Sequence, residues 1–220
     1  MLVDLRVARL TALVVGGGSA AAKKVRALVD GGCHDVKVLA PSFCEDLEKM
    51  AKNERRVELV NGVVDPSEPE AFQSYLMGRQ LVVAATSDKA LNRSIVKCAR
   101  GLGATCAVVD DPAACDFFFV ASTKVGRFEL GVSSGGIAPG LAAVARDHLE
   151  ASFPRWLVAA AEVAAAIRPR VKEKFSTAAR RAAVLKVIFA DATVVSLLEE
   201  GNIERATSEA VNLMEREECS

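Results

Sequence analysis

The chain has 220 residues, 51% of them hydrophobic, and its 28 basic and 28 acidic side chains leave a formal net charge of zero. A neutral chain has no overall field that draws it to nucleic acid or to a membrane surface, so we expect neither partner. No apolar run reaches membrane-spanning length, and no signal-peptide pattern begins the chain, so the sequence predicts a cytoplasmic protein.

The first 112 residues alternate between predicted strands and predicted helices. Apolar runs predict strands at 11–15, 36–40, 56–60, 81–86 and 105–110, and periodic segments predict helices at 19–31, 43–52 and 88–100. Strands that alternate with helices form parallel sheets. We therefore expect a Rossmann-like, doubly wound α/β domain over residues 1–112.

After Pro112 the pattern changes to consecutive strands and then to helices. Strands are predicted at 117–122 and 127–134, with Phe128, Leu130 and Val132 alternating along the second. A helix opens at Pro139 and runs to about Glu150, and further helices are predicted at 158–166, 171–190, 192–200 and 203–217. The sequence thus predicts a small α+β segment over 113–150 and an all-helical C-terminal domain over 151–220.

The cysteines and histidines form no recognisable metal-ligand pattern. The six cysteines include no C-x-x-C pair and no spacing typical of zinc ligands. His34 and His148, the two histidines, lie outside any cluster of ligand residues. We expect buried, reduced thiols and no metal site.

The stretch LVVGGGSAAAKK contains a glycine turn between the first strand and the first helix. In Gly16-x-Gly18-x-x-Ala21, Gly16 permits a tight turn, Gly18 lets a pyrophosphate approach the backbone, and Ala21 allows close helix packing. The helix N-terminus then faces the anion. The alternative is a tight strand-to-helix turn with no ligand.

The second strand lacks the acidic residue that holds the adenosine ribose in many dinucleotide-binding domains. It ends in Leu39-Ala40-Pro41-Ser42 instead. The motif alone therefore does not choose between NAD and NADP. The Ser42 hydroxyl is a candidate ribose ligand, or else a helix cap.

Two polar stretches follow the fourth and fifth strands, at the edge where such sheets bind ligands. Thr86, Asp88 and Asn92 either line the nicotinamide side of a cofactor or cap the next helix. Asp110 and Asp111 are adjacent carboxylates, and neighbours in an extended strand point in opposite directions, so only one of them can face the cleft. A carboxylate beside a cofactor is a candidate general base, although Asp before Pro is also common in plain turns.

Two later stretches are candidate anion sites. The segment SSGGIAP (133–139) places hydroxyls and backbone amides ahead of a helix, where they bind a carboxylate or phosphate or simply form a turn. Residues 168–186 carry seven basic side chains against Glu173 alone. Such a run is either a solvated face or a site for a polyanionic ligand.

The order LVVGGGSAAAKK, AATSD..LN, VVDDP..CDFFF, LGVSSGGIAPGLA and RVKEKFSTAARR resembles the precorrin-2 dehydrogenase/sirohydrochlorin ferrochelatase family, the module found in siroheme synthases. The resemblance covers nearly the whole chain. It implies an NAD-dependent oxidation of precorrin-2 to sirohydrochlorin. It also implies a homodimer, in which segment 113–150 forms much of the interface and the helical domain closes over the cleft.

The resemblance also assigns roles to individual residues. Asp110 matches the family's catalytic aspartate, and Ser134 its substrate-side serine. The phosphate-binding turn falls on Gly16, Gly17, Gly18, Ser19 and Ala20. Precorrin-2 carries many carboxylates, so a basic wall would orient it; this wall consists of Arg168, Arg170, Lys172, Lys174, Arg180 and Arg181.

Two alternatives remain at this point. The chain could also insert Fe²⁺, as a substrate, into sirohydrochlorin, since the same carboxylate could accept the pyrrole protons. From a different class, it could be a dimeric regulator that senses NAD or NADH without turnover.

Overall fold

The computed structural model describes residues 2–65 and 69–218. Contacts divide the chain into two compact units, Met1–Val120 with Ser133–Pro139, and Ala121–Val132 with Gly140–Ser220. The hairpin strands and the helices after Gly140 thus belong to one unit. The predicted three segments, with boundaries at 112 and 150, stay a prediction. No helix among the described residues is both long and apolar enough to cross a membrane.

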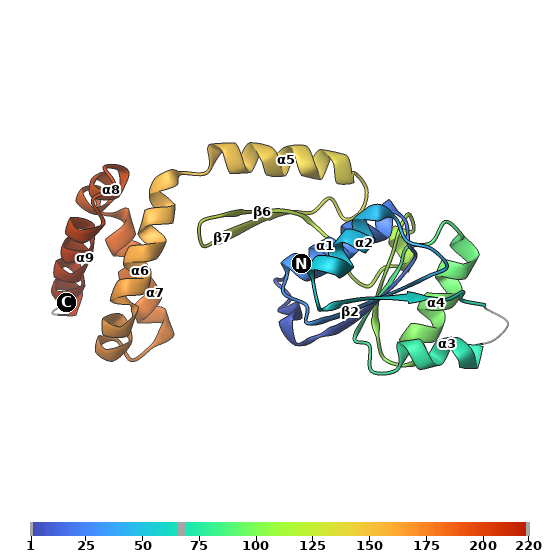
Figure 1. The fold of residues 1–220 in the computed structure, drawn as a ribbon. Coiled ribbons are helices and arrows are strands. Elements are labelled where there is room, and N and C mark those ends of the chain that lie inside the picture. The colour runs from blue at the N-terminus through green and yellow to red at the C-terminus, as the bar shows by residue number, and fades with distance from the viewer. Residues whose placement is uncertain (1, 66–68, 219–220) are drawn as a thin grey trace. The chain divides into compact units, whose positions relative to one another are not determined.

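The first unit is built on a five-stranded parallel sheet in the order β3-β2-β1-β4-β5 (Figure 1). Its strands are β1 (Thr11–Val15), β2 (Asp35–Ala40), β3 (Val57–Asn61), β4 (Leu81–Ala84) and β5 (Thr105–Val108). β1 pairs with β2 on one side and with β4 on the other, so the order of the strands reverses there. Ligands of such sheets bind at the carboxyl ends of the strands beside this reversal.

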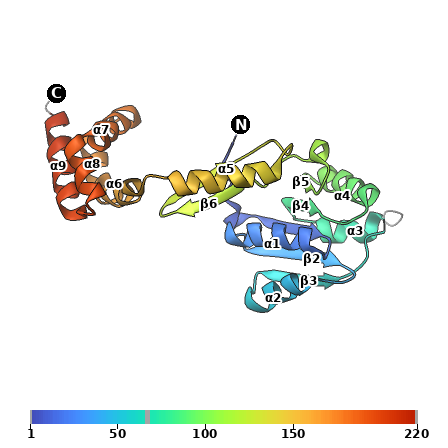
Figure 2. The same cartoon turned by 90° about the horizontal axis from the view of Figure 1, so that it is seen from above.

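Helices cover both faces of the sheet, which explains why β1 is apolar at every central position. Ala12 and Val14 face α1 and α2, whereas Leu13 and Val15 face α3 and α4. Figure 2 shows α1 and α2 near β2 and β3. The helices of this unit are α1 (Ser19–Asp30), α2 (Glu45–Asn53), α3 (Pro69–Leu76) and α4 (Lys89–Gly101), with 3₁₀ turns η1 (Val7–Arg9) and η2 (Pro112–Ala114). The fold is therefore the predicted Rossmann-like α/β fold.

Three details of the first unit differ from the predictions. Helix α3 was not predicted; it buries Phe72 and Leu76, one turn apart, against the sheet. The fourth and fifth strands end two residues early, at Ala84 and Val108. The early end of β5 has a local cause, since Asp110 adopts a left-handed conformation that no strand contains.

The strand predicted at 117–122 is also wrong in its position, because β6 begins only at Ala121. Phe117 and Phe119 do alternate inward, with ring centroids 5.4 Å apart, and both pack against the sheet's core. Their alternation reflects packing against that core, since this segment pairs with no strand in the described part of the chain.

The second unit contains an antiparallel hairpin and a helical bundle. The hairpin consists of β6 (Ala121–Val125) and β7 (Phe128–Val132). The helices are α5 (Pro139–Ser152), α6 (Arg155–Lys174), α7 (Ala178–Ala190), α8 (Ala192–Glu199) and α9 (Ile203–Glu218). The α5 helix runs beside the hairpin (Figures 1 and 2), and the Thr123 hydroxyl donates a 2.8 Å hydrogen bond to the Glu150 carboxylate.

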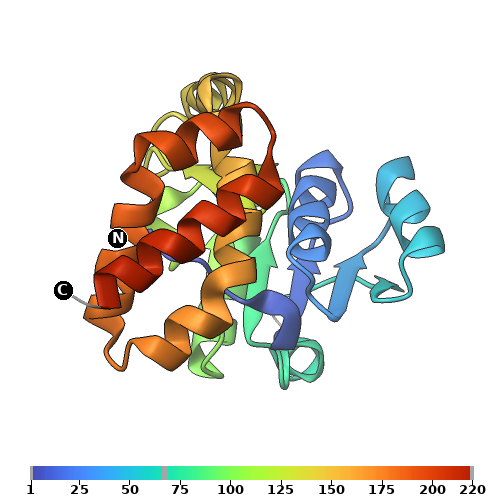
Figure 3. The same cartoon turned by 90° about the vertical axis from the view of Figure 1, so that its left-hand side faces the viewer.

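The bundle has its own hydrophobic core. Helix α9 packs against α6 and α8 (Figure 3). The buried side chains of the bundle recur at helical spacing, with Val163, Ile167 and Val171 on α6. The helix break was predicted between 166 and 171, but α6 continues through Pro169. Pro169 lies on the exposed side, where water can bind the carbonyl that the missing N–H leaves without a donor. The break comes instead before α7, where the Thr177 hydroxyl caps the Arg180 amide.

Candidate functional site

The turn between β1 and α1 requires glycine at its first two positions. Gly16 has φ +130°, and a Cβ there would lie 2.3 Å from the carbonyl oxygen of Ala85. A Cβ on Gly17 would lie 1.8 Å from the carbonyl oxygen of Ser42. The backbone amide of Cys44 also donates to the Gly17 carbonyl at 2.8 Å. This close packing joins the first strand-to-helix turn to the second.

At Gly18, unlike at the two preceding glycines, neither the backbone conformation nor a neighbouring atom of the protein requires a glycine. Its φ of −89° suits any residue, and a Cβ built on it meets nothing within 4 Å. It is the N-cap of α1, so the first amides of the helix point outward without helical partners. Because glycine has no side chain, an anionic ligand can closely approach the backbone amides at this helix N-terminus.

A cleft of about 770 Å³ opens at this turn, along the carboxyl ends of the strands. Every predicted cofactor residue and the predicted catalytic aspartate line it; these are Gly16, Gly17, Gly18, Ser19, Ala20, Ser42, Thr86, Asp88 and Asp110. The structure therefore brings together side chains that are up to 94 positions apart in the sequence.

Ser42 lies in the cleft and does not cap α2. The helix begins at Glu45, its N-cap is Cys44, and no side chain caps that end. Ser42 is exposed, so its hydroxyl is accessible from the cleft. Of the two roles open from the sequence, capping is not the one observed.

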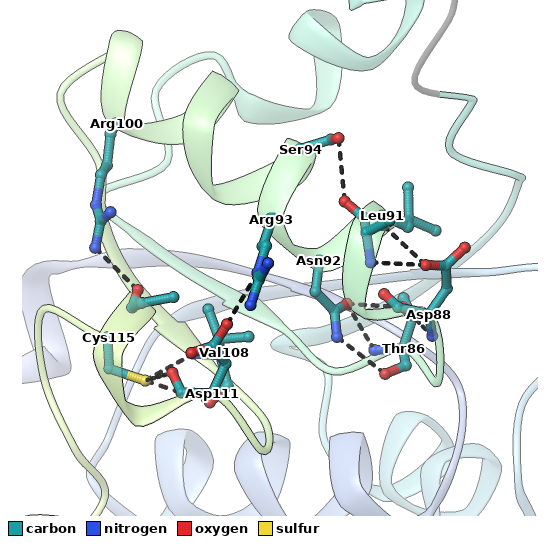
Figure 4. A network of polar contacts seen from close by, with 12 residues as sticks. Thr86, Asp88, Leu91, Asn92, Arg93, Ser94, Arg100, Val108, Asp111 and Cys115 are labelled. Atoms are coloured by element: carbon teal, nitrogen blue, oxygen red, sulfur yellow. Dashed lines mark hydrogen bonds and ion pairs between the residues drawn. The ribbon is translucent and has the colours of Figure 1, made fainter.

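Thr86 and Asp88 do serve as structural residues at the start of α4 (Figure 4). The Asp88 carboxylate accepts hydrogen bonds from the amides of Ala90 and Leu91, at 2.8 and 3.0 Å. The Thr86 hydroxyl lies 2.7 Å from the amide oxygen of Asn92, whose side chain is only 1% exposed. Asp88 is thus the N-cap of α4, and Thr86 is held beside it by Asn92, so any contact of either residue with a cofactor would be additional.

The adjacent aspartates at the end of β5 face different surroundings. Asp110 is exposed and lines the cleft. The Asp111 carboxylate accepts a 3.1 Å hydrogen bond from the Arg93 guanidinium and lines a separate pocket along α4 (Figure 4). Only one of these two carboxylates therefore faces the cleft, as expected from the sequence, although the cause is a left-handed turn rather than strand alternation.

A second ion pair is hydrogen-bonded to the first half of β5. The Arg100 guanidinium contacts the Asp116 carboxylate at 2.6 Å, and Asp116 also accepts a 2.8 Å hydrogen bond from the Cys106 amide. The hydrogen bond from Arg100 lowers the pKa of Asp116. Burial raises the pKa of the Cys106 thiol to about 11, so this cysteine stays protonated and unreactive at neutral pH.

Ser134 does not line the cleft. Its hydroxyl accepts a 3.0 Å hydrogen bond from the Ala138 amide and so stabilises the turn before α5. The same loop packs near the turn that carries Asp110, because a Cβ on Gly136 would lie 3.2 Å from the Cβ of Pro112.

Two cations of the basic run, Arg180 and Arg181, bind other parts of the helical unit. Arg180 contacts the Glu217 carbonyl at 2.6 Å and its carboxylate at 3.4 Å, which ties α7 to α9. Arg181 donates to the carbonyls of Phe175 and Ser176, both at 2.8 Å. The predicted substrate residues on α6 lie in its last two turns, where the first three are exposed and the last is half-buried; they are Arg168, Arg170, Lys172 and Lys174.

The sequence interpretation missed several residues that line the cleft. They include Phe43 and Cys44 after β2, Gly62, Val63 and Val64 after β3, and Leu91 on α4. The segment 62–64 follows the third strand directly, so its position at the ligand-binding edge of the sheet could have been predicted from the sequence. Among the described residues, no group of three or more His, Cys, Asp or Glu side chains could hold a metal ion.

Comparisons with known proteins agree with this geometry. Residues 3–121 match the model of a family described as "Putative NAD(P)-binding". A siroheme synthase from Sodalis glossinidius is 34% identical over 207 residues, which is 94% of this chain and 41% of that protein. A siroheme synthase from Nitrosospira multiformis is 36% identical over 171 residues, 77% of this chain and 35% of that protein. The chain thus spans less than half the length of these relatives.

A solved structure named "SirC, precorrin-2 dehydrogenase" has the same fold. It superposes with a TM-score of 0.65 over 95% of this chain and 99% of its own, at 18% sequence identity. Because the family model covers more than half of the 220 residues, the chain belongs to this NAD(P)-binding family.

Proposed function

We propose that the chain is a dehydrogenase that uses NAD to oxidise precorrin-2 to sirohydrochlorin. The observation that carries the proposal is that one cleft contains both an anion-binding glycine turn and an exposed aspartate. The choice of substrate is supported by the names of its relatives, which are siroheme synthases, and of its structural neighbour, a precorrin-2 dehydrogenase.

The residues of the cleft fit a dinucleotide. The open space at Gly18 leaves room for a pyrophosphate, and the amides of Ser19 and Ala20 at the start of α1 would hold it. The exposed Ser42 hydroxyl at the end of β2 would bind the adenosine ribose. Among the described residues that line the cleft, no basic side chain is present to bind a 2′-phosphate, which favours NAD over NADP.

The oxidation removes a hydride and a proton from the tetrapyrrole. When bound, NAD supplies the hydride acceptor. Asp110 would accept the proton, since its carboxylate is exposed in the cleft and its neighbour Asp111 is held by Arg93. Thr86 and Asp88 would border the nicotinamide, on the fixed end of α4.

The substrate and the dimer partner would use residues outside this cleft. We assign Ser134 and the α6 cations, Arg168, Arg170, Lys172 and Lys174, to the carboxylates of precorrin-2. A homodimer through the hairpin and α5 would cover Leu141 and Val144, which are 69% and 63% exposed. A cytoplasmic location stays a prediction.

The test is an anaerobic assay with the purified protein and precorrin-2, with NAD, with NADP and with neither. The proposal expects sirohydrochlorin to form with NAD, more slowly with NADP, and not without a cofactor. Binding of NAD without any oxidation would support a regulator instead and contradict the proposal.

The same assay decides whether the chain also inserts iron. The exposed Asp110 carboxylate is a candidate acceptor for the two pyrrole protons that insertion releases, taking them one at a time and passing each to water. Fe²⁺ is added as a substrate once oxidation is complete, beside a control without protein. Formation of siroheme faster than in that control would establish the second activity.

A further inference from the structure

The turn that carries Asp110 adopts a conformation that needs outside support. Among the described residues, Asp110 is the one non-glycine residue with positive φ, at +60°. Left-handed backbone is unfavourable for a residue with a side chain and persists where surrounding contacts hold it. The contacts around residues 108–111 therefore bear on where the Asp110 carboxylate points.

Cys115 contacts both ends of this turn (Figure 4). Its sulfur accepts a hydrogen bond from the Val108 amide at 3.1 Å. The same sulfur lies 3.3 Å from the Val108 carbonyl oxygen and 3.4 Å from the Asp111 carbonyl oxygen, and its single proton can be donated to either. One half-buried thiol thus connects the first and last residues of the turn.

Arg93 holds the turn from the side of α4 (Figure 4). Its Nε donates to the Asp111 carboxylate at 3.1 Å, and that carboxylate is 18% exposed whereas Arg93 is 70% exposed. Asp111 is therefore anchored away from the cleft. The residue before it, Asp110, is left as the carboxylate on the cleft side.

We propose that Arg93 and Cys115 are positioning residues that hold the turn 108–111 so that Asp110 faces the cleft. This inference rests on the proposed function, because it assigns both residues to the proton-accepting step. Neither residue lines the cleft, so both act through the backbone of the turn.

The test compares Arg93→Ala and Arg93→Lys with Lys97→Ala as the matched control. Lys97 lies one turn further along α4 and lines the same pocket as Arg93, whereas the ion pair to Asp111 comes from Arg93. A misplaced catalytic group can cost up to about 100-fold, so we expect Arg93→Ala to lower kcat roughly tenfold with KM and NAD affinity unchanged. Arg93→Lys, which keeps the charge, should recover most of the rate. Unchanged kcat in Arg93→Ala would overturn the role of Arg93.

The role of Cys115 is tested by Cys115→Ala, which removes all three contacts, and Cys115→Ser, which keeps a donor and an acceptor. We expect a kcat loss in the alanine variant and partial recovery in the serine variant. Equal kcat in the alanine variant and the wild type would overturn this role. If Cys115→Ala does not fold, the serine variant decides, since its shorter reach should still lower kcat.

A double-mutant cycle separates positioning from a general structural effect. If Arg93 acts through Asp110, Arg93→Ala should cost nothing further when Asp110 is already asparagine. The same fold loss in both backgrounds would overturn the proposal. If the wild-type protein does not oxidise precorrin-2, the proposed function fails, and the φ of Asp110 in a crystal structure of Arg93→Ala Cys115→Ala then decides the positioning role. A retained φ near +60° would overturn it, and a shift to negative φ would support it.

Discussion

The carbonyl oxygen of Ser42 occupies the space that a side chain on Gly17 would need, because a Cβ there would come within 1.8 Å of it. Gly17→Ala must therefore displace the backbone after β2. We expect the variant to lose roughly 1–3 kcal/mol of unfolding free energy, as overpacked sites do. Urea unfolding measures this, with Gly18→Ala as the control, since a Cβ on Gly18 meets nothing. Equal losses in the two variants would contradict the close packing of the turns.

Gly18→Asp separates cofactor binding from folding. The new side chain points into open space, so stability should stay close to that of the wild type. Its negative charge would stand where the pyrophosphate is expected, so NAD binding should be abolished. Calorimetric titration with NAD measures the affinity, and Ala27→Asp, an exposed position on the same helix, controls for the added charge. Wild-type affinity in Gly18→Asp would show that the cofactor binds elsewhere.

The rate at which the Cys44 thiol is alkylated should report whether NAD occupies the cleft, and this test needs no substitution. Cys44 is half-buried and lines the cleft, whereas Cys98 is half-buried on the far part of α4. With NAD at roughly ten times its Kd, alkylation of Cys44 should slow about tenfold, because only the free fraction reacts. Peptide mass spectrometry measures both sites, and Cys98 should react at its original rate. Equal slowing at both would indicate a global effect and would not support binding in this cleft.

Much of the first unit could be predicted from the sequence because both faces of its sheet are covered. The run TALVV is apolar throughout since alternate residues face different helices, and its length marks it as a buried strand. That the residues proposed to bind the cofactor share one cleft could also be predicted, because they follow the strands at one edge of a parallel sheet. The residues after β3, which lie at the same edge, were missed.

Other features depend on contacts between distant residues. The sequence left Asp110 and Asp111 equivalent until the resemblance distinguished them, since it does not show that Arg93, 18 positions before Asp111, and Cys115, four positions after it, contact the turn. In the same way, Phe117 and Phe119 alternate like a strand, although only packing decides that no strand forms there. The basic run looked uniform because the sequence does not show that Arg180 and Arg181 bind the chain itself.

The pairing of Asp116 with Arg100 makes stability depend on pH in acid. The hydrogen bond from Arg100 holds the pKa of Asp116 below its ordinary value of 3.8. A depressed carboxylate pKa stabilises the folded state above the unfolded pKa, and this contribution is lost as the pH falls through the folded pKa. Asp116→Asn should therefore melt below the wild type at neutral pH, and the difference should shrink below about pH 4. A difference in Tm that stays constant across this range would contradict the assignment.

The role of Asp110 is best tested by comparing wild type and Asp110→Asn in anaerobic oxidation of precorrin-2 with NAD, followed by the appearance of NADH and sirohydrochlorin. General-base assistance contributes about 10²- to 10⁴-fold, so the variant should lose activity by that factor. Its affinity for NAD should be unchanged, because the substitution leaves the glycine turn at Gly16–Gly18 intact. Equal rates in the two proteins would contradict the proposal that Asp110 performs the proton transfer in this cleft.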